Sequence, residues 1–143
     1  AKGLSPNEAV ILASIVEEET NLPDEKPLIA GVYLNRLKKG MKLQADPTAR
    51  FAFGDFTIRR ITSAHTTIAS PYNTYYTQGL PPGPICTPEA ATIQAVLHAP
   101  DTNYLYFCAS GDGSGRHLFA VTYREHLANA RAYHKMLNER GVQ

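Results

Sequence analysis

An almost wholly apolar helix near the N-terminus most constrains how this chain can fold. The segment begins with Ser-Pro-Asn-Glu at residues 5–8, where Ser5 can cap the helix and Glu8 stands at the capping-box position. From Ala9 to Val16 the residues are apolar on nearly every side, which is typical of a helix at the centre of a core. The sequence therefore predicts a globular domain packed around this helix.

The same helix ends in three consecutive carboxylates, Glu17, Glu18 and Glu19. At about 100° per residue, Glu17 continues the apolar face, whereas Glu18 and Glu19 turn progressively away from it. A carboxyl group at the wall of a cleft has a raised pKa and can act as a proton donor. The helical face favours Glu17 as this acid, with Glu19 as the main rival and Glu18 solvated. The alternative is an ordinary solvated helix end.

Further sequence signals predict an α+β fold in a single domain, with helices packed around a small β-hairpin. Asp24 can cap a second helix, and Thr122 with Glu125 forms a capping box for the last one. The expected elements are helices over 25–39, 47–53, from 87–89 onward and over 122–139, and strands over 104–109 and 117–121. We expect Leu127, Ala130, Tyr133 and Leu137 to point inward from the last helix.

The stretch from 41 to 86 has little periodicity and is rich in Pro, Thr, Tyr and Asn. A long irregular segment inside a compact domain is usually functional, so we expect it to line a cleft. Gln44 and Asp46 could bind a polar substrate there, although Asp46 could instead cap the short helix at 47–53. Asn73 and Tyr75 offer an amide and a flat ring that suit a sugar, although a structural loop would also explain them.

Composition excludes several classes of function. The net charge of +1 over 143 residues lacks the basic excess of a nucleic-acid binder. No apolar run approaches the roughly 20 residues that cross a bilayer. No nucleotide-binding or dinucleotide fingerprint occurs, and we expect no cofactor.

The cysteines and histidines are too scattered to predict a metal site. Cys86 and Cys108 have no CxxC spacing, and the five His include no paired-His motif. His117 and His126 could approach each other across the hairpin and the last helix. Cys86 and Cys108 could form one disulfide, but Cys108 lies in an apolar strand where a buried free thiol fits well.

Four blocks of residues resemble the catalytic domain of the endolytic murein transglycosylases, the MltG or YceG-like family. Each block is weak alone, but together they follow the family's order and cover nearly the whole chain. They comprise Ala13–Thr20; Val32–Leu37 with Gly40–Thr48; Ser70–Tyr75 with Gly79–Ile85; and Tyr104–Phe107 with His117, Phe119 and Thr122.

The resemblance implies a lytic transglycosylase that cuts peptidoglycan glycan strands internally between N-acetylmuramic acid and N-acetylglucosamine, leaving 1,6-anhydro ends. It maps the acid/base onto Glu17 and makes Gln44, Asp46, Asn73 and Tyr75 cleft-lining candidates. Residues 1–143 would form the catalytic domain, without the transmembrane helix and LysM-like domain that begin full-length members. The expected setting is the outer face of the cytoplasmic membrane, with the cell-wall synthesis machinery as a further candidate partner.

Two rival functions remain open at this point. A non-catalytic glycan-binding module would keep the loop of Tyr, Asn and Pro but would need no buried acid. An ordinary retaining or inverting glycosidase would use two carboxylates, here Glu17 with Asp46.

Overall fold

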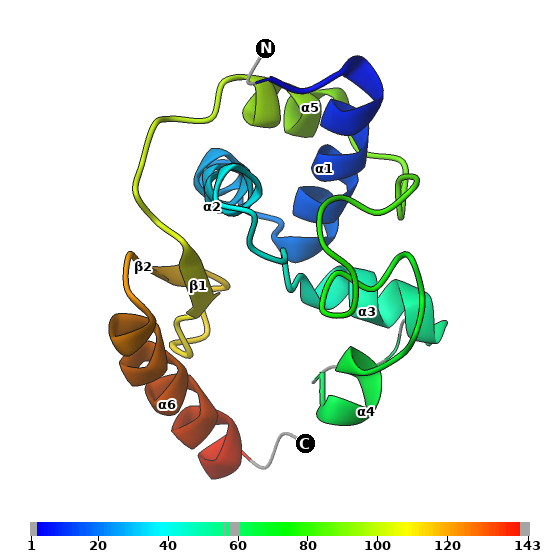
Figure 1. Cartoon of the computed structure of the whole chain (residues 1–143). Coiled ribbons are helices and arrows are strands. Elements are labelled where there is room, and N and C mark those ends of the chain that lie inside the picture. The colour runs from blue at the N-terminus through cyan, green and yellow to red at the C-terminus, as the bar shows by residue number, and fades with distance from the viewer. Residues whose placement is uncertain (1–2, 56, 58–60, 141–143) are drawn as a thin grey trace.

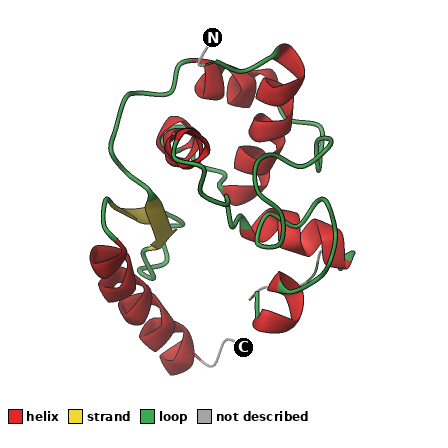
Figure 2. Ribbon diagram, viewed as in Figure 1, coloured by secondary structure: helices red, strands yellow, loops and turns green. Residues whose placement is uncertain are grey.

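The computed structural model describes residues 3–55, 57 and 61–140. Its described part contains six helices and one two-stranded antiparallel sheet, which confirms the expected α+β class (Figures 1 and 2). The elements are α1 (Pro6–Glu19), α2 (Lys26–Lys38), α3 (Asp46–Phe53), α4 (Ser63–Thr66), α5 (Ala90–Leu97), β1 (Tyr106–Ala109), β2 (His117–Ala120) and α6 (Tyr123–Arg140).

Helix α1 lies at the centre of the core, as its composition predicted. It packs on α2, α3 and α5, and its residues from Ile11 to Val16 are all buried. Ser5 and Glu8 form the expected capping box, with Glu8 N–H donating to Ser5 Oγ at 3.2 Å. The cluster of buried residues around α1 draws on α2, on α5 and on the irregular middle of the chain, including Leu43 and Ile85.

Two expected helix starts are wrong in detail. Helix α2 has Glu25 rather than Asp24 at its N-cap, and no side chain caps it. Asp24 instead forms an exposed ion pair with Arg116 at 2.7 Å. Helix α5 begins at Ala90, after the Thr-Pro-Glu segment, because Glu89 still has an extended backbone.

The hairpin pairs Tyr106 with Ala120 and Ala109 with His117. Helix α6 follows directly, and among the described elements it packs only on β1 and β2. Its start is fixed by the predicted box, in which Glu125 N–H donates to Thr122 Oγ1 at 3.2 Å.

The prediction of which α6 residues point inward is only partly correct. Ala130 and Tyr133 are half-buried, but Leu127 is exposed, because within the described residues no element besides the hairpin packs on this helix. Leu137 lies outside the described side chains. In Figure 1, α6 runs down one side of the molecule, opposite α3 and α4.

The middle of the chain is folded around a buried threonine pair. Thr74 Oγ1 accepts from Ala45 N–H at 2.9 Å and lies 2.7 Å from Thr48 Oγ1. Gln44 N–H also donates to the Thr74 carbonyl at 3.2 Å. These bonds hold residues 44–48 against 73–75, and they bring together two segments that lie far apart in sequence.

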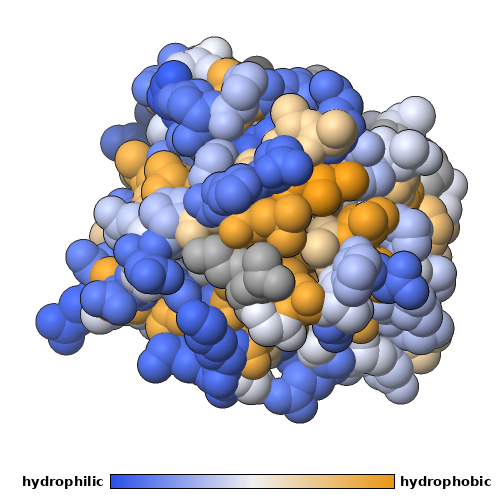
Figure 3. All heavy atoms as spheres, turned by 90° about the horizontal axis from the view of Figure 1, so that it is seen from above, coloured by the Kyte–Doolittle hydropathy of each residue, from blue (hydrophilic) through white to orange (hydrophobic). Residues whose placement is uncertain are grey.

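Seen from above, the surface gathers apolar side chains near the middle of the face, with hydrophilic side chains around them (Figure 3). A groove with mostly apolar walls, including Leu4, Leu34, Leu37 and Leu80, lies between the N-terminal segment and the end of α2. Within the described ranges, no helix combines the length and apolar character required to cross a membrane.

Candidate active site

A cavity of about 400 Å³ lies where the end of α1, the middle of α2, the start of α3, the hairpin and α6 face one another. Its size falls within the range of roughly 300–1,000 Å³ that is common for small-ligand sites. Of the six candidate residues from the sequence, Glu19, Gln44, Asp46 and Tyr75 line this cavity. Glu17 and Asn73 do not line it.

Glu19 occupies one wall of the cavity as the last residue of α1. Its side chain is partly open to the cavity but is densely surrounded by protein atoms, and Tyr33 Oη donates to its Oε1 at 2.6 Å. Burial and the charge of Asp46 raise the pKa of Glu19 to about 7, against smaller lowering effects of the Tyr33 hydrogen bond and Arg50. With this pKa, a substantial fraction of Glu19 is protonated at near-neutral pH and can donate a proton.

Asp46 is the second carboxylate of the cavity. Tyr75 Oη donates a hydrogen bond to Asp46 Oδ1, and burial raises the pKa of Asp46 despite this bond and the charge of Arg50. The expected capping role is wrong, because Ala45 is the N-cap of α3 and Asp46 already lies in its first turn. Its carboxylate is thus available to the cavity rather than tied to a helix end.

Gln44 lies on the cavity wall in a strained conformation. Its φ of 49° is in the left-handed region, which a residue with a side chain adopts only at a cost of about 1–3 kcal/mol. The bonds of the threonine pair hold this conformation in place. An exposed side-chain amide that lines the same cavity as two carboxyl groups is suited to hydrogen-bonding a polar ligand.

Asn73 does not line the cavity and instead has a structural role in its loop. It is fully buried, and its Nδ2 donates to the carbonyls of Thr66 and Ile68 at 3.0 and 2.9 Å. Its Oδ1 accepts from Tyr75 N–H at 3.1 Å. The expectation that Asn73 lines the cleft is therefore wrong, because its amide is used within the loop that positions Tyr75.

Glu17 points to the other side of α1, toward α5. Its Oε1 accepts from Thr92 Oγ1 at 2.7 Å and from Glu89 N–H at 3.0 Å, and its Oε2 lies 3.4 Å from Lys26 Nζ. Burial raises the pKa of Glu17, but these hydrogen bonds and the Lys26 charge outweigh burial and lower it. The expected raised pKa at Glu17 is thus wrong, and this carboxylate is held ionised outside the cavity.

The sequence did not single out Tyr33 or Arg36 as site residues. Tyr33 fits the apolar stripe of α2, yet a buried Tyr hydroxyl usually needs a partner, and this one binds Glu19. Arg36 is also buried, donating to the carbonyls of Leu105 and Lys42 at 2.6 and 2.7 Å. Its guanidinium lies 4.9 Å from the centre of the Tyr106 ring, so it supports the hairpin wall of the cavity.

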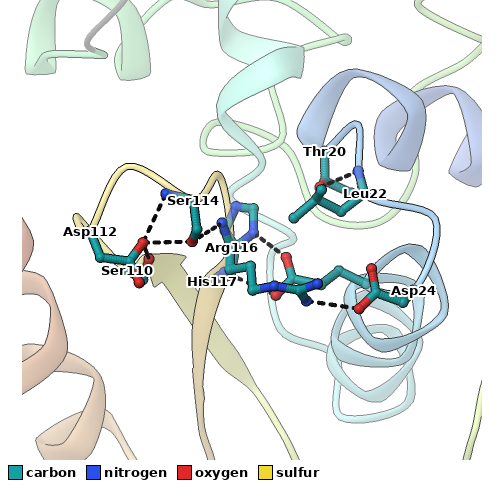
Figure 4. Close-up of polar contacts among 9 residues, drawn as sticks. Thr20, Leu22, Asp24, Ser110, Asp112, Ser114, Arg116 and His117 are labelled. Atoms are coloured by element: carbon teal, nitrogen blue, oxygen red, sulfur yellow. Dashed lines mark hydrogen bonds and ion pairs between the residues drawn. The ribbon is translucent and has the colours of Figure 1, made fainter.

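The hairpin is also fastened to the start of α2. His117 N–H donates to Glu25 Oε2 at 3.0 Å, and His117 Nδ1 lies 2.9 Å from Glu25 Oε1. Figure 4 shows the neighbouring loop, in which Arg116 reaches Asp24 and Asp112 accepts from Ser110 and Ser114. His117 and His126 both line the cavity, but each contacts different partners: His126 stacks with Tyr106, and His117 lies against Glu25.

Neither cysteine forms a disulfide, and both are free thiols. Cys86 Sγ donates to the Ser14 carbonyl at 3.3 Å, and Cys108 lines the cavity. Burial raises the pKa of both thiols, that of Cys86 to about 11. Among the described residues, no group of three or more His, Cys, Asp or Glu side chains could hold a metal ion.

Comparison with known proteins identifies relatives along nearly the whole chain. Residues 1–132 match the model of the YceG-like family. The chain is 39% identical to an endolytic murein transglycosylase of Bacillus subtilis (strain 168), over 96% of this chain and 37% of the relative. It is 33% identical to an endolytic murein transglycosylase of Streptococcus pneumoniae serotype 2, over 90% of this chain and 24% of the relative.

A solved structure of a protein from this family has a similar fold. The crystal structure of a yceG-like protein from Listeria monocytogenes superposes with a TM-score of 0.79 at 38% identity, covering 87% of this chain and 40% of the other. This chain therefore spans well under half of the length of each of these relatives.

Proposed function

The chain belongs to the YceG-like family, and from this premise and the chemistry of the cavity we propose that it is the catalytic domain of an endolytic peptidoglycan transglycosylase. The proposed substrate is the glycan strand, cut at the β-1,4 bond between N-acetylmuramic acid and N-acetylglucosamine. The observation that carries the proposal is Glu19, a carboxyl group with a pKa of about 7 in a cavity large enough for a ligand.

In the proposed mechanism Glu19 acts first as an acid and then as a base. Tyr33 occupies Oε1, so the proton to be donated resides on Oε2 and passes to the glycosidic oxygen as the C1–O bond breaks. The Glu19 carboxylate then removes the proton of the muramic acid 6-hydroxyl while O6 bonds to C1. The product is a 1,6-anhydro end, Glu19 is protonated again, and no water is consumed.

One acid/base suffices in this scheme because the nucleophile belongs to the substrate, and intramolecular attack benefits from proximity. Burial, together with the charge of Asp46, favours the protonated form of Glu19, and the Asp46 carboxylate can stabilise the positive oxocarbenium character at C1. Gln44 and Tyr75 are the polar groups that we assign to substrate binding. We place the activity at the outer face of the cytoplasmic membrane, where peptidoglycan is found.

The presence of Asp46 beside Glu19 also favours a second candidate, an ordinary glycosidase that uses this pair of carboxylates. Glu17 cannot take part in such a pair, because it lies on the far side of α1. A hydrolase would add water and leave reducing ends, so the two functions differ in their products.

The test is to incubate the purified domain with peptidoglycan strands and to identify the new ends by mass spectrometry. Anhydro-muramyl ends within fragments are the expected product. Reducing ends would show a hydrolase, and strand binding without new ends would show a glycan-binding module. Either of those results would overturn the proposed reaction.

Replacing Asp46 by Asn should move the pH dependence of the reaction. Removing the Asp46 charge removes the second-largest effect that raises the pKa of Glu19, so Glu19 loses its proton at lower pH. Because the acid must be protonated, the falling limb of kcat/KM against pH should shift to lower pH. Asp112→Asn, an exposed change at the hairpin tip, is the control and should leave the limb in place. An unshifted limb in Asp46→Asn would refute the coupling between Asp46 and Glu19.

A further inference from the structure

An endolytic cut requires that sugars continue on both sides of the bond that is broken. The cavity of about 400 Å³ can enclose only a short part of such a strand. The strand must therefore leave the cavity and pass over the surface beside it. The wall formed by β1 and α6 offers a surface of suitable chemistry for this passage.

Three rings lead from the cavity to the surface along this wall. Tyr106 and His126 both line the cavity and stack with their centroids 5.1 Å apart and their planes at 23°. The Tyr123 ring lies 5.7 Å from Tyr106 and 6.2 Å from His126. Tyr123 is 58% exposed, although it does not line the cavity itself. The rings thus form a continuous path outward.

Both ends of this path are supported: the Tyr106 ring at the cavity end and the backbone that carries Tyr123 at the exposed end. The Arg36 guanidinium lies against the Tyr106 ring, and the box of Thr122 and Glu125 fixes the turn of α6 that carries Tyr123. A ring with a fixed position loses little conformational freedom when a ligand covers it. Leu127, one turn along α6, extends the exposed apolar surface.

Pyranose sugars present flat faces of C–H groups that pack on aromatic rings, and hydroxyls that a Tyr hydroxyl can bond. Contiguous exposed apolar side chains, rather than single scattered ones, are typical of a binding surface. We infer that Tyr106, His126 and Tyr123 form a platform on which the glycan strand continues outside the cavity, with Tyr123 as a determinant of preference for long strands. This inference rests on the proposed function for the identity of the ligand.

The experiment compares kcat/KM on long glycan strands with kcat/KM on a muramyl tetrasaccharide. In Tyr123→Ala the ratio of the long-strand value to the tetrasaccharide value should fall about 10-fold, the scale of one lost aromatic contact. Tyr123→Trp should restore the ratio, since Trp also offers a flat ring. Tyr76→Ala is the matched control, because Tyr76 is 53% exposed and lies outside the cavity wall. Its ratio should equal that of the unaltered chain.

Two results would overturn the platform: an unchanged ratio in Tyr123→Ala, or equal losses on both substrates. Binding of soluble strands, measured by calorimetry in a Glu19→Gln background, separates this inference from the proposed reaction. The Kd for long strands should rise about 10-fold when Tyr123→Ala is added. A chain that bound strands in this way but cut none would refute the proposed function and leave the platform standing, whereas an unchanged Kd would refute the platform.

Discussion

Replacing Glu19 by Gln should lower the turnover of glycan strands by at least about 100-fold, the usual scale of a lost general acid. Gln has the same shape and its carbonyl can still accept from Tyr33, so the fold should remain intact. It has no proton to give to the glycosidic oxygen at any pH. The rate of release of anhydro ends, with circular dichroism as the check on folding, measures the effect.

Glu17→Gln is the matched control, because it makes the same chemical change two residues earlier in the same helix. We expect this variant to keep most of its activity under conditions where it is folded, since Glu17 faces α5 and not the cavity. An inactive, folded Glu17→Gln beside an active Glu19→Gln would reverse the assignment and return the role to Glu17.

The second large effect is on stability. Glu17→Ala should reduce the free energy of unfolding by about 2–3 kcal/mol, because it leaves Lys26 without its charge partner and removes the acceptor used by Thr92 and Glu89 N–H. The Glu17 side chain is 18% exposed, so the loss should not reach the full cost of a completely buried pair. Urea unfolding followed by circular dichroism gives the difference.

Glu18→Ala is the control for stability. Glu18 is exposed on the same turn of α1, and its replacement should change the free energy of unfolding by less than about 0.5 kcal/mol. If Glu17→Ala were no less stable than Glu18→Ala, the bonds from Glu17 to Thr92 and Glu89 N–H would not stabilise the packing of α5 on α1.

Local signals predicted most of the secondary structure. The capping boxes at Ser5 and Thr122 depend only on residues three apart, and both form. The first strand was expected to be two residues longer than β1 and the second one residue longer than β2, because the paired register covers only Tyr106–Ala109 and His117–Ala120. Helix α4 was not predicted, since its four residues have no periodicity to read.

The candidate site depended on contacts that the sequence does not display. Glu17 and Glu19 are two residues apart, so they point to nearly opposite sides of α1. Which side is the cavity depends on where α5 and α2 pack, with Thr92 on one side and Tyr33 on the other. Apolar periodicity could identify the helix but not the neighbour of each carboxylate.

Asn73 and Tyr33 are two further residues whose roles depend on contacts that the sequence does not display. Asn73 looked suited to a sugar, but its amide bonds the backbone of its own loop. Tyr33 looked like a core residue, but its hydroxyl binds the proposed acid. The signal that could have identified Tyr33 is its hydroxyl. A buried hydroxyl needs a hydrogen-bond partner, and the apolar neighbours in its stripe cannot supply one.

The central claim is that Glu19 carries a proton near neutral pH, and titrating its side-chain carboxyl carbon by ¹³C NMR tests this most directly. The Glu19 and Glu17 resonances can be assigned by comparison with Glu19→Gln and Glu17→Gln. We predict a pKa of about 7 for Glu19 and a pKa below the ordinary value of 4.5 for Glu17. A Glu19 that titrates near 4.5, like a solvated carboxyl group, would contradict the account.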